Sequence, residues 1–477
     1  MRVSAARITP LATAVCLAAC GCASFSGPEE PARLTPVPAT ARIATTTLPP
    51  KSGVIPASYR EETSAHQPPP PTSLPSFPLD GVTALTSEDV VRIVLERNPT
   101  LDQMRASAAA LVARYPQVTS LDDPLLSFNT APGSAWSGPN TEYAARVEIS
   151  QKFLSPGKRG LKGTAARAEA AAAAEDVEDA RLQLSEASRF ALADYFLAVK
   201  GSMVAEENAK LLREFRQNAE TRYKNGQGPQ QDMLQADVEI ARLEERVVSL
   251  RRARLVAIAR LNTLMHLPAD GLLPPPADFG ASSVLPEVAR LRELATERPD
   301  IRAAVSRAAA EEATLALAQK QYNPDFETMA AYDGFWQGVN NRPLQWQVGA
   351  RVNIPLQIGR RNAAVDEARA NVARRRAELA RLTDQVNFQV QEAFEQVRET
   401  DEIVRLYETK ILKTAEANVK EGQTAYANSK IPFLNLLDAQ RNRVALTDRY
   451  YEAVAESVRR RATLGRVVGE PITAPGH

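Results

Sequence analysis

A strict alternation of apolar and polar side chains marks residues Gln345–Leu356. The apolar positions are Trp346, Val348, Ala350, Val352 and Ile354, and the polar positions are Gln345, Gln347, Gly349, Arg351 and Asn353. A period of two predicts a β-strand with one apolar and one polar face. Beyond this stretch the period becomes helical, and it predicts one unbroken helix from Arg361 to about Ala427.

The junction of a strand and a long helix occurs twice in the chain. Arg146–Ser150 resembles Arg351–Pro355, and Gly157–Arg159, before the first long helical stretch, resembles Gly359–Arg361. Internal repeats decide the fold class, so they are identified before other features. We therefore expect two copies of one unit, offset by roughly 200 residues.

Each copy should contain a short helix, a β-hairpin, a long helix and a returning helix. The first repeat is assigned to residues 85–281 and the second to residues 282–468, with a tail over 469–477. The expected β-hairpins are 124–153 and 324–356, and the expected helical hairpins are 159–265 and 361–467. The predicted fold class is therefore mainly α with a small β part.

The lengths of the helices suggest how they pack. At ~1.5 Å per residue, the helix that begins at Arg159 would be roughly 100 Å long. The short helix before the hairpin, interrupted at Asn98–Pro99, and the returning helix together have a similar length. We expect them to stack end to end beside the long helix.

The amino terminus carries a separate signal. Residues 1–19 form a basic and then apolar stretch of the size of a secretory signal peptide, and Leu17–Cys20 resembles a bacterial lipobox. Cys20 is then the predicted lipidation site, and residues 20–84 are a lipidated, proline-rich linker. The alternative is an ordinary signal peptide with an incidental cysteine.

Composition excludes several classes of function. Lysine and arginine total 58 against 57 acidic residues, which gives no reason to expect a nucleic-acid partner. All three cysteines lie in the first 22 residues, and the three histidines are scattered. We find no catalytic arrangement, cofactor motif or metal-ligand spacing, so we do not expect an enzyme.

Four amphipathic strands cannot make a closed sheet, and open edges are not tolerated in lipid. Each strand has about the ~9 to 11 residues that a tilted strand needs to cross a bilayer. The three tryptophans, Trp136, Trp336 and Trp346, lie in or beside the hairpins, as in an interfacial aromatic belt. We expect several copies to pool their strands. The alternative is a small soluble sheet that caps a coiled coil.

The duplicated order of elements, with Asn98–Pro99, Arg298–Asp300 and Leu436–Gln440, resembles the TolC-like outer-membrane efflux proteins. The resemblance covers about residues 85–468. It implies a homotrimer whose twelve strands form one transmembrane β-barrel, continuous with a helical barrel in the periplasm. It also implies a periplasmic adaptor and an inner-membrane pump as partners.

The leader and Ser155–Arg159 resemble the branch of this family that serves resistance-nodulation-division pumps, with heavy-metal cations or drugs as cargo. Two other functions stay open. One is the outlet of a type I protein secretion system, and the other is a periplasmic coiled-coil structural lipoprotein without a pore.

A duct needs a gate at the far end of its helical tube, where rings of carboxylates or amides favour cations. The candidate gate residues are Asp232, Asn435 and Asp438. The resemblance implies that Asn435 and Asp438 occupy constriction-ring positions. From the residues alone, Asp232 and Asp438 are also ordinary carboxylates near helix starts.

The candidate adaptor-docking tips are the two turns of the helical hairpins. Their residues are Gly226, Gly228, Pro229, Ser429 and Pro432.

Overall fold

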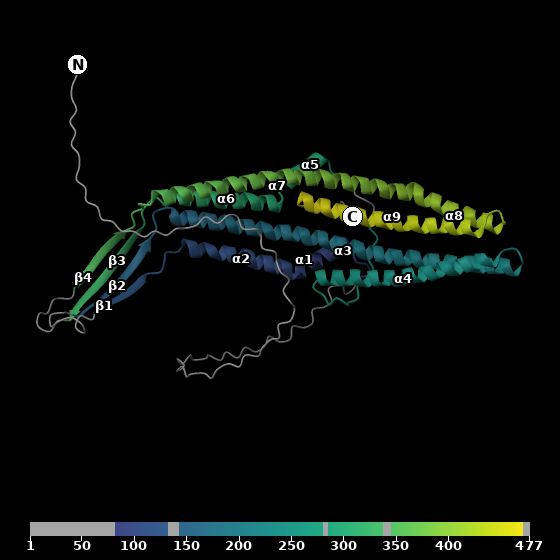
Figure 1. Cartoon of the computed structure of the whole chain (residues 1–477), viewed down its shortest axis with the longest axis horizontal. Helices are drawn as coiled ribbons and strands as arrows, with labels where there is room; N and C mark the ends of the chain where they lie inside the picture. The colour runs from purple at the N-terminus through teal and green to yellow at the C-terminus, as the bar shows by residue number, and fades with distance from the viewer. Residues whose placement is uncertain (1–81, 132–142, 280–284, 337–344, 471–477) are drawn as a thin grey trace, which may run out of the picture. The chain divides into compact units, whose positions relative to one another are not determined.

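Long helices and one four-stranded sheet make up the described part of the chain (Figure 1). The computed structural model describes residues 82–131, 143–279, 285–336 and 345–470. The first repeat contains α1 (Ser87–Arg97), α2 (Pro99–Thr119), β1 (Leu125–Ala131), β2 (Tyr143–Phe153), α3 (Lys158–Lys224) and α4 (Gln230–Leu264). The second contains α5 (Val288–Ala295), α6 (Pro299–Lys320), β3 (Phe326–Trp336), β4 (Gln345–Val352), α7 (Ile358–Leu406), the π-helix η1 (Tyr407–Ile411), α8 (Leu412–Ala427) and α9 (Phe433–Val468).

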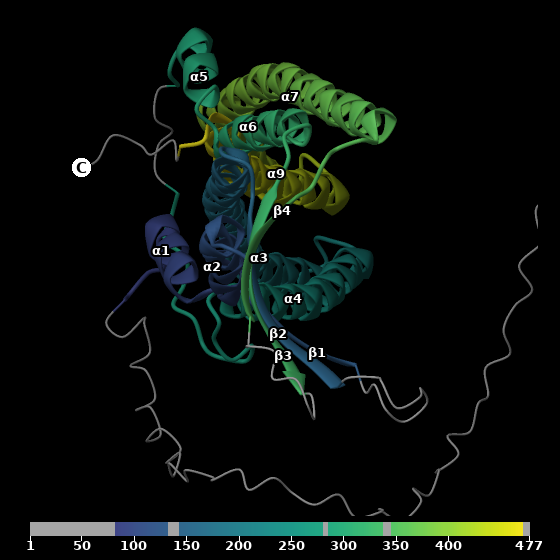
Figure 2. The same ribbon diagram turned by 90° about the vertical axis from the view of Figure 1, so that its left-hand side faces the viewer.

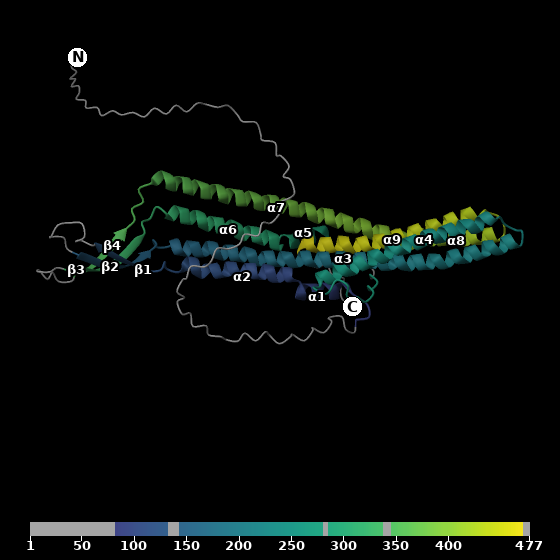
Figure 3. The same cartoon turned by 60° about the horizontal axis from the view of Figure 1, so that its bottom comes forward.

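The short helices stack end to end beside the long ones, as their lengths predict. In the first repeat α1 and α2 pack along one part of α3, and α4 returns along the rest of it (Figures 1 and 3). In the second repeat α5, α6 and α9 pack against α7, and α6 and α9 also pack against α3. Figure 2 shows α6 and α9 lying between α7 and α3. The two repeats therefore meet along the length of α3.

Asn98 and Arg298, which precede Pro99 and Pro299 at equivalent places in the two repeats, form hydrogen bonds that connect the short helices. The Asn98 side chain accepts a hydrogen bond from the Thr100 N–H and so caps α2. Its amide nitrogen donates to the carbonyl of Leu264, the last residue of α4, at 2.8 Å. In the second repeat Arg298 donates to the carbonyl of Val467 at 3.2 Å, near the end of α9. Each motif thus joins the two short helices of its own repeat where they meet.

A hydrophobic core surrounds the middle of α3. Tyr195 is completely buried there, and its hydroxyl donates to the carbonyl of Pro274 at 3.2 Å in the connector after α4. The Leu85 N–H donates to the carbonyl of Pro275, so the segment before α1 pairs with this connector. The core includes Ile93, Leu192, Leu261 and Met265. The segment before α1 and the connector after α4 thus both stabilise the region where α1 and α4 meet beside α3.

The second long helix differs from its prediction in two ways. It begins at Ile358 rather than Arg361, and a π turn over Tyr407–Ile411 separates α7 from α8. The prediction of one unbroken helix is therefore wrong. No residue of the π turn is buried, so the apolar pattern from which the helix was predicted carries no trace of the wider turn. The short helix α5 was also not predicted.

The four strands form one antiparallel sheet in the order β1-β2-β3-β4. β1 and β2 match their predicted bounds, whereas β4 ends at Val352 and not at Leu356. The Asn353 N–H still donates to the carbonyl of Asp325, its partner in the same register, but Pro355 has no N–H with which to extend the ladder. β2 pairs with β3 along its whole length and joins the two hairpins.

Among the described residues, none of the helices combines the length and the apolar character that crossing a bilayer requires.

Candidate functional site

One face of the sheet is apolar and exposed. The registers place Leu126, Ile149, Ala330 and Val348 in one row across the four strands, and Phe128, Val147, Tyr332 and Trp346 in the next. Residues directly opposite each other in antiparallel strands share a face. Val348 is 87% exposed and Trp346 is 77% exposed. A contiguous exposed apolar surface of this kind marks contact with a membrane or another protein.

The opposite face is charged, and its charges pair across strands. Arg146 contacts Glu148 at 3.0 Å and Asp333 at 3.8 Å. Arg351 contacts Glu327 at 3.2 Å and Glu148 at 3.6 Å, so it extends the network from β2 through β3 to β4. The sheet therefore separates an apolar surface from a hydrophilic one, as the strand periodicity predicts.

Both edges of the sheet are open within the described residues. β1 pairs only with β2 and β4 pairs only with β3, which leaves a row of backbone groups on each outer side. Of the predicted aromatic belt, Trp346 packs on Tyr332 with ring centres 4.8 Å apart. Trp136 lies outside the described residues, and nothing is described of the Trp336 side chain.

A buried ion pair joins the sheet to the helices. The ammonium of Lys158, at the start of α3, lies 2.8 Å from a carboxylate oxygen of Asp325, just before β3, and donates to the carbonyl of Asn323. The same carboxylate accepts the Ser155 N–H at 2.9 Å. Burial raises the pKa of Asp325, but Lys158 and Ser155 hold it below its ordinary value of 3.8. This cluster connects the end of the first hairpin to the beginning of the second.

The two helical tips have the same backbone structure. Asn225 and Asn428 donate their N–H groups to Thr221 and Thr424, respectively. The positive φ of 69° at Gly226 is repeated as 58° at Ser429. The next residues close each turn with a further bond: the Gln227 and Lys430 N–H groups donate to the carbonyls of Arg222 and Ala425. The repeat read from the sequence therefore extends to individual hydrogen bonds.

A side-chain latch, formed by Arg222, Asp232 and Tyr426, joins the two tips. The Tyr426 hydroxyl donates to the Asp232 carboxylate at 3.1 Å. Arg222 donates to the Tyr426 carbonyl and, at 2.8 Å, to the Ser429 hydroxyl, and its guanidinium lies over the Tyr426 ring. Burial and the neighbouring Asp232 carboxylate raise the pKa of Tyr426 to about 12.

The structure places Asp232 on α4 and the other two predicted gate residues on α9. Asp232 is partly buried and engaged by Tyr426, whereas Asn435 and Asp438 are exposed on α9. Asp438 accepts a hydrogen bond from Arg441 at 2.9 Å, and Arg441 also contacts Glu239 on α4. Asp232 and Asp438 therefore have different hydrogen-bond partners.

The predicted docking residues lie at the ends of the tips. Gly226, Pro229, Ser429 and Pro432 are exposed, and Gly228 is half-buried. Neither Arg222 nor Tyr426 was predicted to be functional. The parallel between the tip sequences Tyr223–Pro229 and Tyr426–Pro432 points to Tyr426, whereas Arg222 lies outside it. Cys20 lies outside the described residues.

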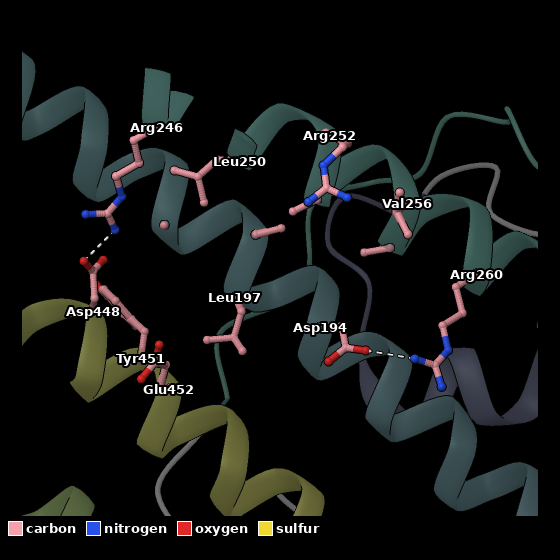
Figure 4. Close-up of a pocket in the computed structure, with 14 residues that line it drawn as sticks. Asp194, Leu197, Arg246, Leu250, Arg252, Val256, Arg260, Asp448, Tyr451 and Glu452 are labelled. Atoms are coloured by element: carbon pink, nitrogen blue, oxygen red, sulfur yellow. Dashed lines mark hydrogen bonds and ion pairs between the residues drawn. The ribbon is translucent and has the colours of Figure 1, made fainter. Parts of the chain in front are cut away.

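A groove of about 500 Å³ lies between α3, α4 and α9 (Figure 4). Leu197, Leu250 and Val256 supply apolar walls. Arg246 on α4 reaches across to Asp448 on α9 at 2.5 Å, as Figure 4 shows. The groove is thus crossed by a contact between the two repeats.

A model of the outer membrane efflux protein family matches residues 291–470, which run from α5 to the end of α9. This segment, which is less than half of the chain, is similar to the outer membrane efflux protein family. The match confirms the resemblance read from the sequence. A search of curated proteins finds no match to the chain.

Solved structures extend the similarity beyond the outer membrane efflux protein domain to the first repeat. The outer-membrane channel OprN is 21% identical with a TM-score of 0.71, over 82% of this chain and 91% of that one. CusC is 16% identical with a TM-score of 0.73, over 80% of this chain and 92% of that one. VceC from Vibrio cholerae is 17% identical with a TM-score of 0.70, over 81% of this chain and 97% of that one. The fold class predicted from the sequence is confirmed.

Proposed function

We propose that the chain is the outer-membrane exit duct of a tripartite efflux system, which conducts its cargo passively out of the cell. The observation that carries the proposal is the two-faced sheet. Its apolar face is exposed, its charged face pairs its own charges, and both its edges are open. A duct needs such a wall, apolar toward lipid and hydrophilic toward the lumen, and needs no catalytic group.

The open edges support a homotrimer. The β1 edge of one copy would pair with the β4 edge of the next, so that no edge faces lipid. Three copies of four strands give a twelve-stranded barrel, and even strand numbers from about eight upward are usual for such barrels. The helices would continue this wall as a helical barrel in the periplasm.

Three further parts of the proposal concern the surroundings of the duct. Lipidation of Cys20 would anchor the chain to the outer membrane. The tips around Gly226 and Ser429 would contact a periplasmic adaptor, since they are exposed and point away from the sheet (Figure 1). The adaptor in turn would connect the duct to an inner-membrane pump.

The tips would also hold the gate. The latch joins Asp232 to Tyr426 and so fixes the two tips of one copy to each other. Asn435 and Asp438 are exposed and one helical turn apart. Three copies would present three Asp438 carboxylates, whose combined field favours cations.

Replacing Asp438 with alanine should lower the cation-to-anion permeability ratio of the duct, because it removes one carboxylate per copy from the proposed constriction. The ratio is measured from reversal potentials in salt gradients. The matched control is Asp102→Ala, which removes an exposed carboxylate on α2 that is also paired with an arginine three positions on. Equal ratios in the two variants and the unaltered protein would exclude Asp438 from the gate.

Replacing Tyr426 with phenylalanine should raise single-channel conductance, because the latch loses its hydroxyl while the ring stays packed on Phe433. The control is Tyr450→Phe, which removes a similar bond, 3.0 Å long, to Glu408 away from the tips. The role of the latch in the gate would be contradicted if Tyr450→Phe raised the conductance as much as Tyr426→Phe. It would also be contradicted if neither substitution raised it.

A deletion strain tests the function itself. Loss of the gene should sensitise the bacterium to several small toxic compounds, metals or drugs, and the intact gene should restore resistance. Intracellular cargo should accumulate in the deletion strain. Unchanged susceptibility together with the loss of a secreted protein from the medium would instead identify a protein secretion outlet.

A further inference from the structure

We infer that neighbouring copies of the chain join through a seam that repeats the contacts between the two halves of one chain. The seam would bring α8 and α9 of one copy against α4 and the end of α3 of the next copy. The inference rests on the proposed trimeric duct, and it names the residues that hold the copies together.

The basis is a constant offset between the repeats at the tips. Ala427, the end of α8, lies 203 positions after Lys224, the end of α3, and Phe433, the start of α9, lies 203 positions after Gln230, the start of α4. α4 and α9 then run without interruption for 35 and 36 residues. Each pair of positions that touch between the two repeats therefore has an equivalent pair of positions between copies, found by exchanging the repeats, and the residues at those positions decide whether the contact is kept.

The hydrogen bond of the latch between Tyr426 and Asp232 has such a counterpart, whereas Arg222 has none because the equivalent residue is Ala425. Within one chain Tyr426 donates to Asp232. The equivalent residues are Tyr223 and Asn435, which are both exposed. Tyr223 is 45% exposed, whereas Tyr426 is only 6% exposed. A phenol can donate to the oxygen of an amide as well as to that of a carboxylate. Tyr223 of the next copy can therefore make the same hydrogen bond, to Asn435.

The apolar packing of the seam follows the same rule. Leu437 on α9 is 1% exposed in a core that also contains Leu212 and Phe215 of α3. Its equivalent on α4, Leu234, is 52% exposed. The positions on α8 equivalent to Leu212 and Phe215 hold Ala415 and Asn418, so a second copy would cover Leu234 with smaller and more polar side chains than those around Leu437.

The ion pair across the groove in Figure 4 is the third contact. Arg246 lies 2.5 Å from Asp448. The equivalent residues are Arg449 and Glu245, so the signs of the charges are kept. Both are exposed, and within the described part of the chain neither takes part in an ion pair. Arg449 of one copy should bind Glu245 of the next.

Not every contact is repeated. Arg441 binds Glu239 within the chain at 2.5 Å, but the equivalent positions hold Val238 and Asn442. The seam between copies should therefore contain the hydrogen bond from Tyr223 to Asn435, the contact that covers Leu234, and the ion pair of Arg449 with Glu245.

Cross-linking tests the seam in the full-length chain, in membranes and with Cys22→Ser. Glu245→Cys and Arg449→Cys are combined, and a bismaleimide series is applied. The length of the reagent is calibrated with Arg246→Cys and Asp448→Cys, whose thiols should be linked within one chain. We expect the 245/449 variant to give products of two and three chains with that same reagent, and each single-cysteine variant to give far fewer. Tyr223→Cys with Asn435→Cys provides an independent second pair at the tip.

The outcomes separate the seam from the duct. A trimer by native mass, with neither pair linked between chains by the calibrated reagent, would overturn the seam and leave the duct standing. A monomer in the unaltered protein would overturn both. Products between chains from both pairs, with the 246/448 link confined to single chains, would support the seam.

Discussion

Placing arginine at Val348 should abolish the heat-resistant oligomer. Val348 is the most exposed residue of the apolar face, and it shares a row with Ala330, Ile149 and Leu126 near the middle of the strands. An arginine on the lipid face near the bilayer midplane costs about 2–4 kcal/mol per copy. The measurement is the amount of oligomer that survives heating to graded temperatures in detergent before electrophoresis.

Gln347→Arg is the matched control, because Gln347 is the neighbouring residue on the charged face. It should leave the oligomer nearly as stable as in the unaltered protein. If Val348→Arg assembled as well as Gln347→Arg, the apolar face would not be in contact with lipid.

Replacing Lys158 with methionine should destabilise the chain by about 3–5 kcal/mol, the usual cost of leaving a buried charge without its partner. Lys158 is 2% exposed and holds the carboxylate of Asp325, which lies at the other hairpin. The free energy of unfolding is measured in guanidinium chloride by following helical circular dichroism. Combining Lys158→Met with Asp325→Asn should recover part of the loss, because the amide oxygen still accepts the Ser155 N–H.

The pH dependence gives a second signature of this ion pair. The pKa of Asp325 is lowered in the folded chain, so the contribution of the pair is present above the ordinary carboxyl pKa of 3.8 and is lost as the pH falls through the folded value. The difference between Lys158→Met and the unaltered protein should therefore shrink in acid. Lys224→Met, which breaks an exposed ion pair with Glu220, should leave the stability nearly unchanged at any pH. A similar effect of both substitutions would contradict the role of Lys158.

Much of the fold could be predicted from the sequence because it follows from periodicity. The alternation over Tyr143–Phe153 and the helical stripe after Arg159 each identified an element to within a residue or two. The repeat then gave the packing of the short helices. The π turn at Tyr407–Ile411 and the early end of β4 depend instead on backbone hydrogen bonds, about which the hydrophobic pattern carries no information.

The site could be predicted less well, because its residues act across repeats. Asp232 was identified by its place near a helix start, but its partner Tyr426 is 194 positions away in the sequence. Lys158 was noted only as part of a motif, since nothing local indicates that Asp325 meets it. Asp438 is exposed on α9, and its role in the gate is still a prediction.

Planar-bilayer recording of the purified full-length protein tests the central claim most directly. If several copies pair the edges of their sheets to form one β-barrel in the membrane, the protein should produce discrete conductance steps. At equal protein concentration, Val348→Arg should produce far fewer steps than Gln347→Arg. A protein that inserts no conducting unit and runs as a monomer in detergent would contradict the duct and the assembly on which it depends.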